Sequence, residues 1–288
     1  MMMVLPTQDS LARANHCRLL LDIDRDKARH LGQAAVDIID GGGYSHCGNW
    51  IDLTTALKRE RDQKYSISPD AELPLASPRF DKTTIQIANE TSLMAARRFS
   101  KRGLVPLVLN FANGVSPGGG FLHGSRAQEE TLCFSSTLYA SLVGDPFYLR
   151  HRKRSDKASS THTILSHATV FCDDTYETIS EPWTMGVMTC AAPVCRPNEI
   201  EPSRAKELMD ERIRRVLSIA SAYGYEYLVL GAWGCGAFRN NPEHTALSFR
   251  AAIEMEQKGK FSEVVFAISD WSAERRFIKP FHDVFHSD

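Results

Sequence analysis

The sequence has no excess of charge of one sign, no long apolar run and no paired cysteines. Its 288 residues carry a formal net charge of -1, which offers no overall attraction to duplex DNA or to an anionic membrane. No apolar run reaches the roughly eighteen residues that span a bilayer, and the start MMMVLPTQD lacks the basic and apolar regions of a secretory signal. We therefore expect a cytoplasmic protein that binds neither membranes nor duplex DNA and holds any anionic ligand by local groups.

The seven cysteines are odd in number, and none stands in a C-x-x-C pair or at zinc-ligand spacing. This pattern is not a disulfide framework and agrees with a cytoplasmic location. Cys133, Cys172 and Cys190 lie in apolar stretches, where each is expected to be a small buried hydrophobe. We expect no metal site and no cofactor.

The first part of the chain reads as helical. Residues 10–40 carry apolar side chains at mostly helical spacing, and the glycines at 41–43 then end the helix as a cap and turn. Residues 66–81 contain three prolines, too many for a helix or an inner strand. We predict an N-terminal helical accessory region over residues 1–65 and a proline-rich connector over residues 66–82.

From residue 83 to residue 288 strand-like and helix-like segments alternate. Strands are predicted at 83–88, 106–112, 168–172, 186–191, 227–231 and 264–268, and helices at 91–102, 131–143, 203–223, 242–258 and 272–285. This alternation predicts an α/β fold with a mostly parallel or mixed sheet covered on both faces. The basic run from Arg150 to Arg154 could steer a polyanionic polymer, but a solvated flexible loop over 149–160 is the expected structure.

The stretch from Asn110 to Glu130, NFANGVSPGGGFLHGSRAQEE, joins a glycine triplet to two adjacent glutamates. It follows a predicted strand and precedes a predicted helix, and ligands of α/β proteins bind beyond the carboxyl ends of such strands. Three glycines let a ligand approach the backbone closely, and adjacent carboxylates offer acid/base chemistry for cleaving a sugar bond. Alone, the glutamates would be a solvated first helical turn. His123 is expected to be an exposed loop residue.

A second glycine-rich loop, LGAWGCGAFRNN, runs from Leu230 to Asn241 between a predicted strand and a predicted helix. Backbone N–H groups and a helix N-terminus converge on phosphate at such a position. The loop is neither a P-loop nor G-x-G-x-x-G. Two loops of this kind suit a ligand that has a diphosphate between two sugars. Trp233, within the second loop, is expected to be a core residue.

These motifs together resemble a known family. The pattern GGG, seven residues, then QEE (Gly118 to Gly120, Gln128 to Glu130) is similar to the signature of the poly(ADP-ribose) glycohydrolases, and GAWGCGAF is similar to their second ligand loop. NFANGVSPGGG and the helical N-terminus resemble the compact microbial branch, and the resemblance covers the chain from about residue 13 to its end. It implies a macrodomain-like three-layer α/β/α sandwich with a mixed sheet and an added N-terminal helical region.

The chemistry that the resemblance implies is the cleavage of ribose-to-ribose O-glycosidic bonds, releasing ADP-ribose. The departing ribose carbon gains oxocarbenium-like charge, and the leaving oxygen needs a proton. Neighbouring Glu129 and Glu130 diverge by about 100° on a helix, so we do not expect them to flank the bond as a usual glycosidase pair. By resemblance, Glu130 is the general acid and base, and Glu129 hydrogen-bonds ribose hydroxyls.

The resemblance also implies a set of substrate-binding residues. Asn113 would fix the same ribose, Phe238 would pack on a ribose, and the glycine triplet would press against the ribose and diphosphate. The full binding set is Asn113, Gly118, Gly119, Gly120, Gln128, Gly234, Cys235, Gly236, Ala237 and Phe238, with the backbone N–H groups of residues 234–237 on the diphosphate. The sequence departs from the family pattern at Val194, where an asparagine would be expected after Ala-Pro.

Two alternatives from other classes remain open. A hydrolase that removes a single ADP-ribose from protein or nucleic acid would keep the acid and change the leaving group. A macrodomain that only binds ADP-ribose would have no reason for the adjacent acids, so Glu130 discriminates a glycohydrolase from this non-catalytic alternative. The expected partners are ADP-ribose, poly(ADP-ribose) or ADP-ribosylated protein, the expected state is a monomer, and exo and endo cleavage both stay open.

Overall fold

The computed structural model describes residues 1–154, 158–196 and 200–287. Its centre is an eight-stranded mixed sheet in the order β1-β5-β10-β9-β6-β8-β7-β4. Neighbours from β1 to β8 run parallel, whereas β7 is antiparallel to β8 and β4 is antiparallel to β7. The strands are β1 (Met2–Val4), β4 (Tyr65–Ile67), β5 (Thr83–Ala88), β6 (Leu107–Phe111), β7 (Thr163–Cys172), β8 (Thr178–Cys190), β9 (Tyr227–Leu230) and β10 (Glu263–Ala267).

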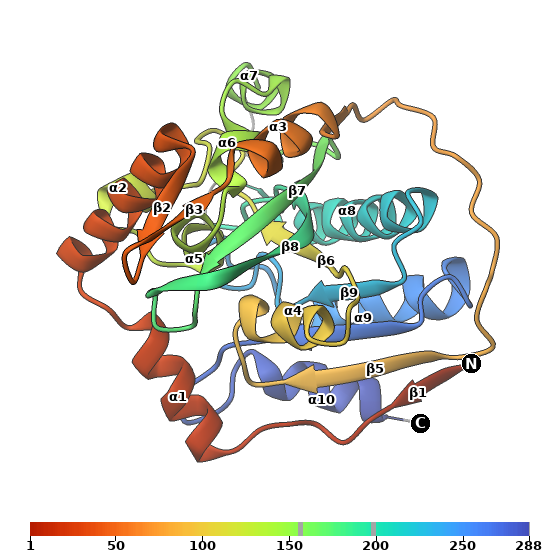
Figure 1. Ribbon diagram of the computed structural model, residues 1–288. Helices are drawn as coiled ribbons and strands as arrows, with labels where there is room; N and C mark the ends of the chain where they lie inside the picture. The colour runs from red at the N-terminus through yellow and green to blue at the C-terminus, as the bar shows by residue number, and fades with distance from the viewer. Residues whose placement is uncertain (155–157, 197–199, 288) are drawn as a thin grey trace.

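Helices cover both faces of this sheet (Figure 1). On one face Leu107 and Leu109 of β6 join a core with α8 (Pro202–Ala222), α9 (Pro242–Ala251) and α10 (Ile278–His286). On the other face Val108 joins a core with α4 (Ser92–Ser100), α5 (Gln128–Ser135) and α6 (Leu138–Leu142). Successive residues of a strand point to opposite faces, so β6 supplies both cores. The predicted three-layer α/β/α sandwich with a mixed sheet is confirmed.

The N-terminal region holds the helices that the sequence predicts, together with strands that it does not. The expected helix over 10–40 is two helices, α1 (Leu11–Leu21) and α2 (Arg25–Gly41), because Asp24 caps the second by accepting from the N–H of Lys27 at 2.7 Å. Gly42 caps α2 in the left-handed conformation at φ 71°, as expected. After β2 (Gly43–His46) and β3 (Asn49–Asp52), α3 (Thr54–Asp62) follows.

The predicted N-terminal helical region therefore also contains four short strands that the prediction did not include. β2 and β3 pair as a hairpin, and β1 and β4 are the two edge strands of the main sheet. Three-residue edge strands carry too little periodicity to be recognised in a sequence, and long-range pairing decides them. The proposed division into accessory region, connector and catalytic body stays a prediction. Figure 1 shows the connector as a trace along the outside of the molecule.

Two segments beside the first glycine loop also differ from expectation. The helix predicted at 131–143 begins at Gln128 and is interrupted after Ser135, where Ser136 bridges to Val170 and the N–H of Thr137 donates to Thr169 O at 3.0 Å. The flexible loop predicted at 149–160 is wrong for its first residues, because α7 (Pro146–Arg152) extends to Arg152. Residues 155–157 lie outside the described residues. Within the described ranges, no helix has both the length and the apolar character needed to cross a membrane.

Candidate active site

A cavity of about 440 Å³ lies where the two glycine-rich loops leave the sheet. Its walls come from the ends of β6, β9 and β10, from the first turn of α5 and from the start of α4. The volume falls within the range of about 300 to 1,000 Å³ that is usual for small-molecule sites. The cavity also lies at the carboxyl ends of parallel strands, the position expected for a ligand of an α/β protein.

Glu130 is fixed at the floor of this cavity by two backbone N–H groups. Its Oε1 accepts from the N–H of Gly120 and its Oε2 from the N–H of Ala127, each at 2.9 Å. Ala127 is the N-cap of α5 but has no side-chain acceptor, so the Glu130 carboxylate satisfies the N-cap N–H itself. The side chain is only 7% exposed, and it lines the cavity. Each oxygen uses one lone pair here and keeps a second one.

Glu129 lies deeper and is held from the strand side. Its Oε2 accepts from the N–H of Asn113 at 2.7 Å, and its Oε1 accepts from Nδ2 of Asn110 at 3.3 Å. Asn110, fully buried in β6, also donates to Thr189 Oγ1 of β8 at 3.1 Å. Burial raises the pKa of Glu129 well above its ordinary value, and the charge of Glu130 raises it further, while the Asn113 N–H opposes the shift.

The two carboxylates meet at Gly119, which explains why a glycine stands there. A Cβ on Gly119 would lie 3.0 Å from Glu129 Oε2 and under 3.0 Å from Glu130 Oε1, and the backbone has φ 62°. Both facts require glycine. The divergence expected for sequence neighbours on a helix therefore holds for the Cβ directions only, because the long side chains bend back toward one glycine. The triplet packs against the acids, but Gly118, Gly119 and Gly120 do not line the cavity, so their expected contact with a ligand stays a prediction.

Gln128 and Asn113 have different parts in the site. The amide of Gln128 accepts from the N–H of Phe111 at 2.9 Å and donates to Leu109 O and Ser92 Oγ at 2.8 and 3.1 Å. Both amide hydrogens are thereby used, so Gln128 ties α5 to β6; the residue also lines the cavity, and its predicted contact with the substrate stays a prediction. Asn113 accepts from two N–H groups of its own loop, and its Nδ2 carries no hydrogen bond among the described residues.

The second loop presents backbone donors to the cavity. Gly234, Gly236, Ala237 and Phe238 line the cavity, and the N–H groups of residues 236–238 have no backbone acceptor within the described part of the chain. Cys235 differs from this expectation: its N–H donates to Ala232 O at 3.1 Å, its side chain is buried, and it does not line the cavity. Successive N–H groups without a backbone acceptor are suited to bind an anion such as a diphosphate, so the predicted role of this loop stays a prediction.

Other residues that the sequence singled out have no proposed part in the chemistry of the cavity. Trp233 is fully buried and His123 is exposed, as predicted. Val194 does not line the cavity; its neighbour Pro193 accepts from Nδ2 of Asn240 at 2.8 Å, which fastens this segment to the second loop. The three apolar cysteines are buried, and all seven cysteines are free thiols.

Two arginines on the cavity wall were missed by the sequence analysis. Arg196 lines the cavity and donates from Nε to Ala237 O at 3.2 Å, and Arg126 lines it while pairing with Asp22 Oδ1 at 3.3 Å. Each places a cation within reach of an anionic ligand. Arg126 stands two residues before the QEE motif, a position that could have drawn attention, whereas Arg196 gives no signal of its own.

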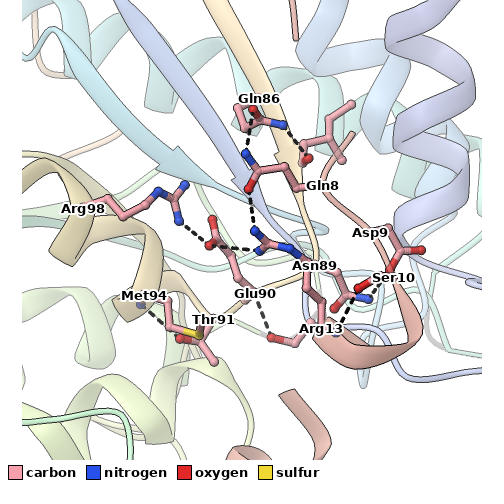
Figure 2. A network of polar contacts seen from close by, with 12 residues as sticks. Gln8, Asp9, Ser10, Arg13, Gln86, Asn89, Glu90, Thr91, Met94 and Arg98 are labelled. Carbon is pink, nitrogen blue, oxygen red and sulfur yellow. Dashed lines mark hydrogen bonds and ion pairs between the residues drawn. The ribbon is translucent and has the colours of Figure 1, made fainter. Parts of the chain in front are cut away.

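The wall beside α4 is held by the N-terminal segment. Thr91 and Ser92, after β5, line the cavity. The preceding Glu90 is buried and pairs with Arg98 of α4 and with Arg13 of α1, as Figure 2 shows. Asn89 donates to Asp9 at 2.9 Å, also in this network. The segment before α1 thus fixes the turn that forms one side of the cavity.

The buried carboxyl of Glu129 predicts a pH-dependent stability. Because its folded pKa is raised, the protonated form is favoured in the fold, and this contribution is lost as pH rises from the ordinary value through the folded pKa. Glu129→Gln imitates the protonated carboxyl. Its free energy of unfolding, measured in urea, is therefore expected to match that of the wild type below about pH 4.3 and to exceed it increasingly at higher pH. A difference that is independent of pH would contradict the buried, raised-pKa assignment.

Residues 32–173 match the family described as "Microbial-type PARG, catalytic domain". Poly(ADP-ribose) glycohydrolase from Thermomonospora curvata is similar in structure, with a TM-score of 0.85 and 33% identity over 90% of this chain and 100% of that one. The structure of that enzyme bound to the inhibitor ADP-HPD is similar too, with a TM-score of 0.81 and 32% identity over 89% of this chain and 98% of that one.

A structure of poly(ADP-ribose) glycohydrolase from Deinococcus radiodurans in complex with ADP-ribose is also similar. It has a TM-score of 0.74 and 33% identity, over 80% of this chain and 97% of that one. A search of the curated proteins found no match. The similarity therefore extends well beyond the glycine triplet and the glutamates.

Proposed function

The chain belongs to the microbial-type poly(ADP-ribose) glycohydrolase family, and on this premise we propose how its residues cleave poly(ADP-ribose) to ADP-ribose. The observation that carries the proposal is the pair of buried glutamates packed on Gly119 in a cavity that also offers free N–H groups. A module that only binds ADP-ribose does not need two buried carboxyls. No step in the proposal uses a metal or a cofactor.

Glu130 is the general acid and base of this proposal. Its carboxyl reaches the cavity and retains a lone pair on each oxygen beyond those bound to Gly120 and Ala127. A proton on either oxygen would be transferred to the leaving ribose oxygen as oxocarbenium-like charge develops on the other sugar. The carboxylate then accepts a proton from the attacking water.

The simplest scheme would place the catalytic proton on Glu130, and the site departs from it. The raised pKa falls on Glu129, which we expected to act only on ribose hydroxyls. Burial and the neighbouring charge of Glu130 favour a proton on Glu129. We infer that the substrate, which brings a diphosphate and excludes water, places that proton on Glu130. Glu129 then accepts hydroxyl hydrogen bonds from the ribose.

The rest of the cavity positions the substrate. The free Nδ2 of Asn113 is available to the ribose nearest the glutamates, and the N–H groups of residues 236–238 are available to the diphosphate. Phe238 is partly buried against the core beneath the loop and lines the cavity, so its ring can restrict how a sugar lies. Gln128 acts through α5 by fixing the first turn that carries both acids.

Incubation with poly(ADP-ribose) and analysis of the products tests the function. We expect release of ADP-ribose, with turnover unchanged by a chelator. Titration with ADP-ribose and with adenosine in a calorimeter tests the diphosphate site, because adenosine lacks the anion and should bind much more weakly. Turnover of a mono-ADP-ribosylated protein but not of the polymer would favour the alternative hydrolase, and binding without any turnover would favour the non-catalytic alternative.

Several finer expectations stay proposals. A monomer, a cytoplasmic location and the use of ADP-ribosylated protein as a substrate follow from the sequence and the family premise. The free state of all seven cysteines supports a reducing compartment. Gel filtration with light scattering would test the monomer, and fractionation of cells would test the location.

A further inference from the structure

A basic surface on α7 is held rigidly and is not a flexible loop. Phe147, Tyr148 and His151 are buried on one side of this helix, at 0%, 2% and 6% exposure. On the other side Arg150, Arg152 and Lys153 are exposed, and we refer to these three as the α7 patch. His151 fixes the helix further by accepting from the N–H of Ser160 at 3.0 Å. The charged side chains therefore project from a fixed base.

The α7 patch is attached directly to the first ligand loop. Nε of Arg152 donates to Val115 O at 2.8 Å. The ring of His151 packs 3.4 Å from the point where a Cβ on Gly114 would lie. Both contacts fall just after Asn113, whose N–H holds Glu129. The patch consequently borders the loop that positions one of the two acids.

The described part of the protein leaves the charges of the α7 patch without an ion pair. Within the described ranges, none of the three residues forms an ion pair. His151, on the buried side of α7, has its pKa lowered to about 4 chiefly by burial, which the Phe147 carbonyl opposes and the charges of Arg212 and Arg154 reinforce. Because the whole chain has a net charge of -1, the excess of positive charge at the α7 patch is a local feature. Unpaired cations on a fixed surface are suited to bind an anion that comes from outside the protein.

We propose that the α7 patch binds the phosphates of the poly(ADP-ribose) units adjoining the one in the cavity. The proposal rests on the proposed function, because that function supplies the polymer. Every unit of the polymer carries a diphosphate, so a segment leaving the cavity past the first loop presents repeated negative charge to α7. Such contacts increase the encounter rate and the affinity for long chains, and they weaken with salt.

The test compares long and short substrates in one double variant. Arg150→Gln/Lys153→Gln removes two charges and leaves Arg152, which anchors Val115. On long poly(ADP-ribose) at low ionic strength we expect kcat/KM to fall about tenfold, and its logarithmic salt dependence to become shallower by about 1.4, or about 0.7 for each charge removed. On a two-unit ADP-ribose oligomer, which has only one adjoining diphosphate, we expect a much smaller fall than on the long polymer. Lys206→Gln/Lys258→Gln is the matched control, because both lysines are exposed, lack ion pairs among the described residues and lie off the cavity wall.

Several outcomes would overturn the proposal. These are an unchanged salt dependence on the long polymer, an equal loss in the control variant, and an equal loss on both substrates, which would mean that α7 acts only through the first loop. Wild-type binding of single-stranded DNA of equal charge as tight as its binding of the polymer would overturn the assigned occupant. Wild-type failure to turn over either substrate would count against the proposed function instead, and polymer affinity measured in parallel would still decide the role of the patch.

Discussion

Glu130→Gln is expected to reduce the turnover of poly(ADP-ribose) by about a hundredfold to ten-thousandfold, the usual scale of general acid and base catalysis. Glutamine nearly preserves the shape of the side chain but cannot release a proton to the leaving oxygen. It can also accept from only one of the two N–H groups that the carboxylate now satisfies. Turnover by product analysis and ADP-ribose affinity by calorimetry would be measured on the same protein samples.

The affinity measurement separates chemistry from loop shape. If the variant binds ADP-ribose nearly as well as the wild type, the loss of rate belongs to proton transfer. Glu129→Gln is the matched comparison, because the same change one residue earlier should lower affinity and rate together. A Glu130→Gln protein with near-normal turnover would remove Glu130 from the mechanism.

Gly119→Ala is expected to lower turnover by at least about a hundredfold, since displacement of a reacting group by about 1 Å can cost that much. The new methyl group would occupy space that Glu130 Oε1 fills and would touch Glu129 Oε2. The residue also has φ 62°, which costs a non-glycine residue about 1 kcal/mol or more. Both acids would have to move, and both turnover and ADP-ribose affinity should report it.

Gly144→Ala is the control for backbone strain. Gly144 has φ 75° and nothing within 4 Å of an added Cβ, so it experiences the strain without the collision. We expect it to lose a similar amount of stability, measured by thermal unfolding, and to keep its turnover. If Gly144→Ala loses turnover as severely, or if Gly119→Ala retains it, the packing of the acids on Gly119 is not what positions them.

The sequence was sufficient to predict the motifs of the site, but not the contacts within it. Glycine triplets and paired acids are local patterns with a local physical meaning, so their place at strand ends was predictable. That Glu129 and Glu130 bend back to one glycine depends on the N–H groups of Asn113 and Ala127, which come from both sides of the loop. No periodic pattern in the sequence indicates that two side chains converge in this way.

The elements that the sequence analysis missed also depend on tertiary contacts that no local pattern shows. β1 and β4 are three residues each and exist because a long strand elsewhere offers them an edge. α7 was obscured by its charged end, although Asp145 caps it and the two aromatics after Pro146 are buried. Cys235 was counted among the diphosphate donors because spacing could not tell which N–H groups the turn itself uses.

The position of β10 has a consequence for biosynthesis. This strand lies between β5 and β9 in the middle of the sheet, yet it comes from residues 263–267, near the end of the chain. During translation the two halves of the sheet cannot join until β10 has left the ribosome, and the apolar edges of β5 and β9 stay open until then. We expect chains arrested before residue 263 to be recognised by chaperones and proteases and to show no partial activity, because β10 and the residues after it complete the cavity wall.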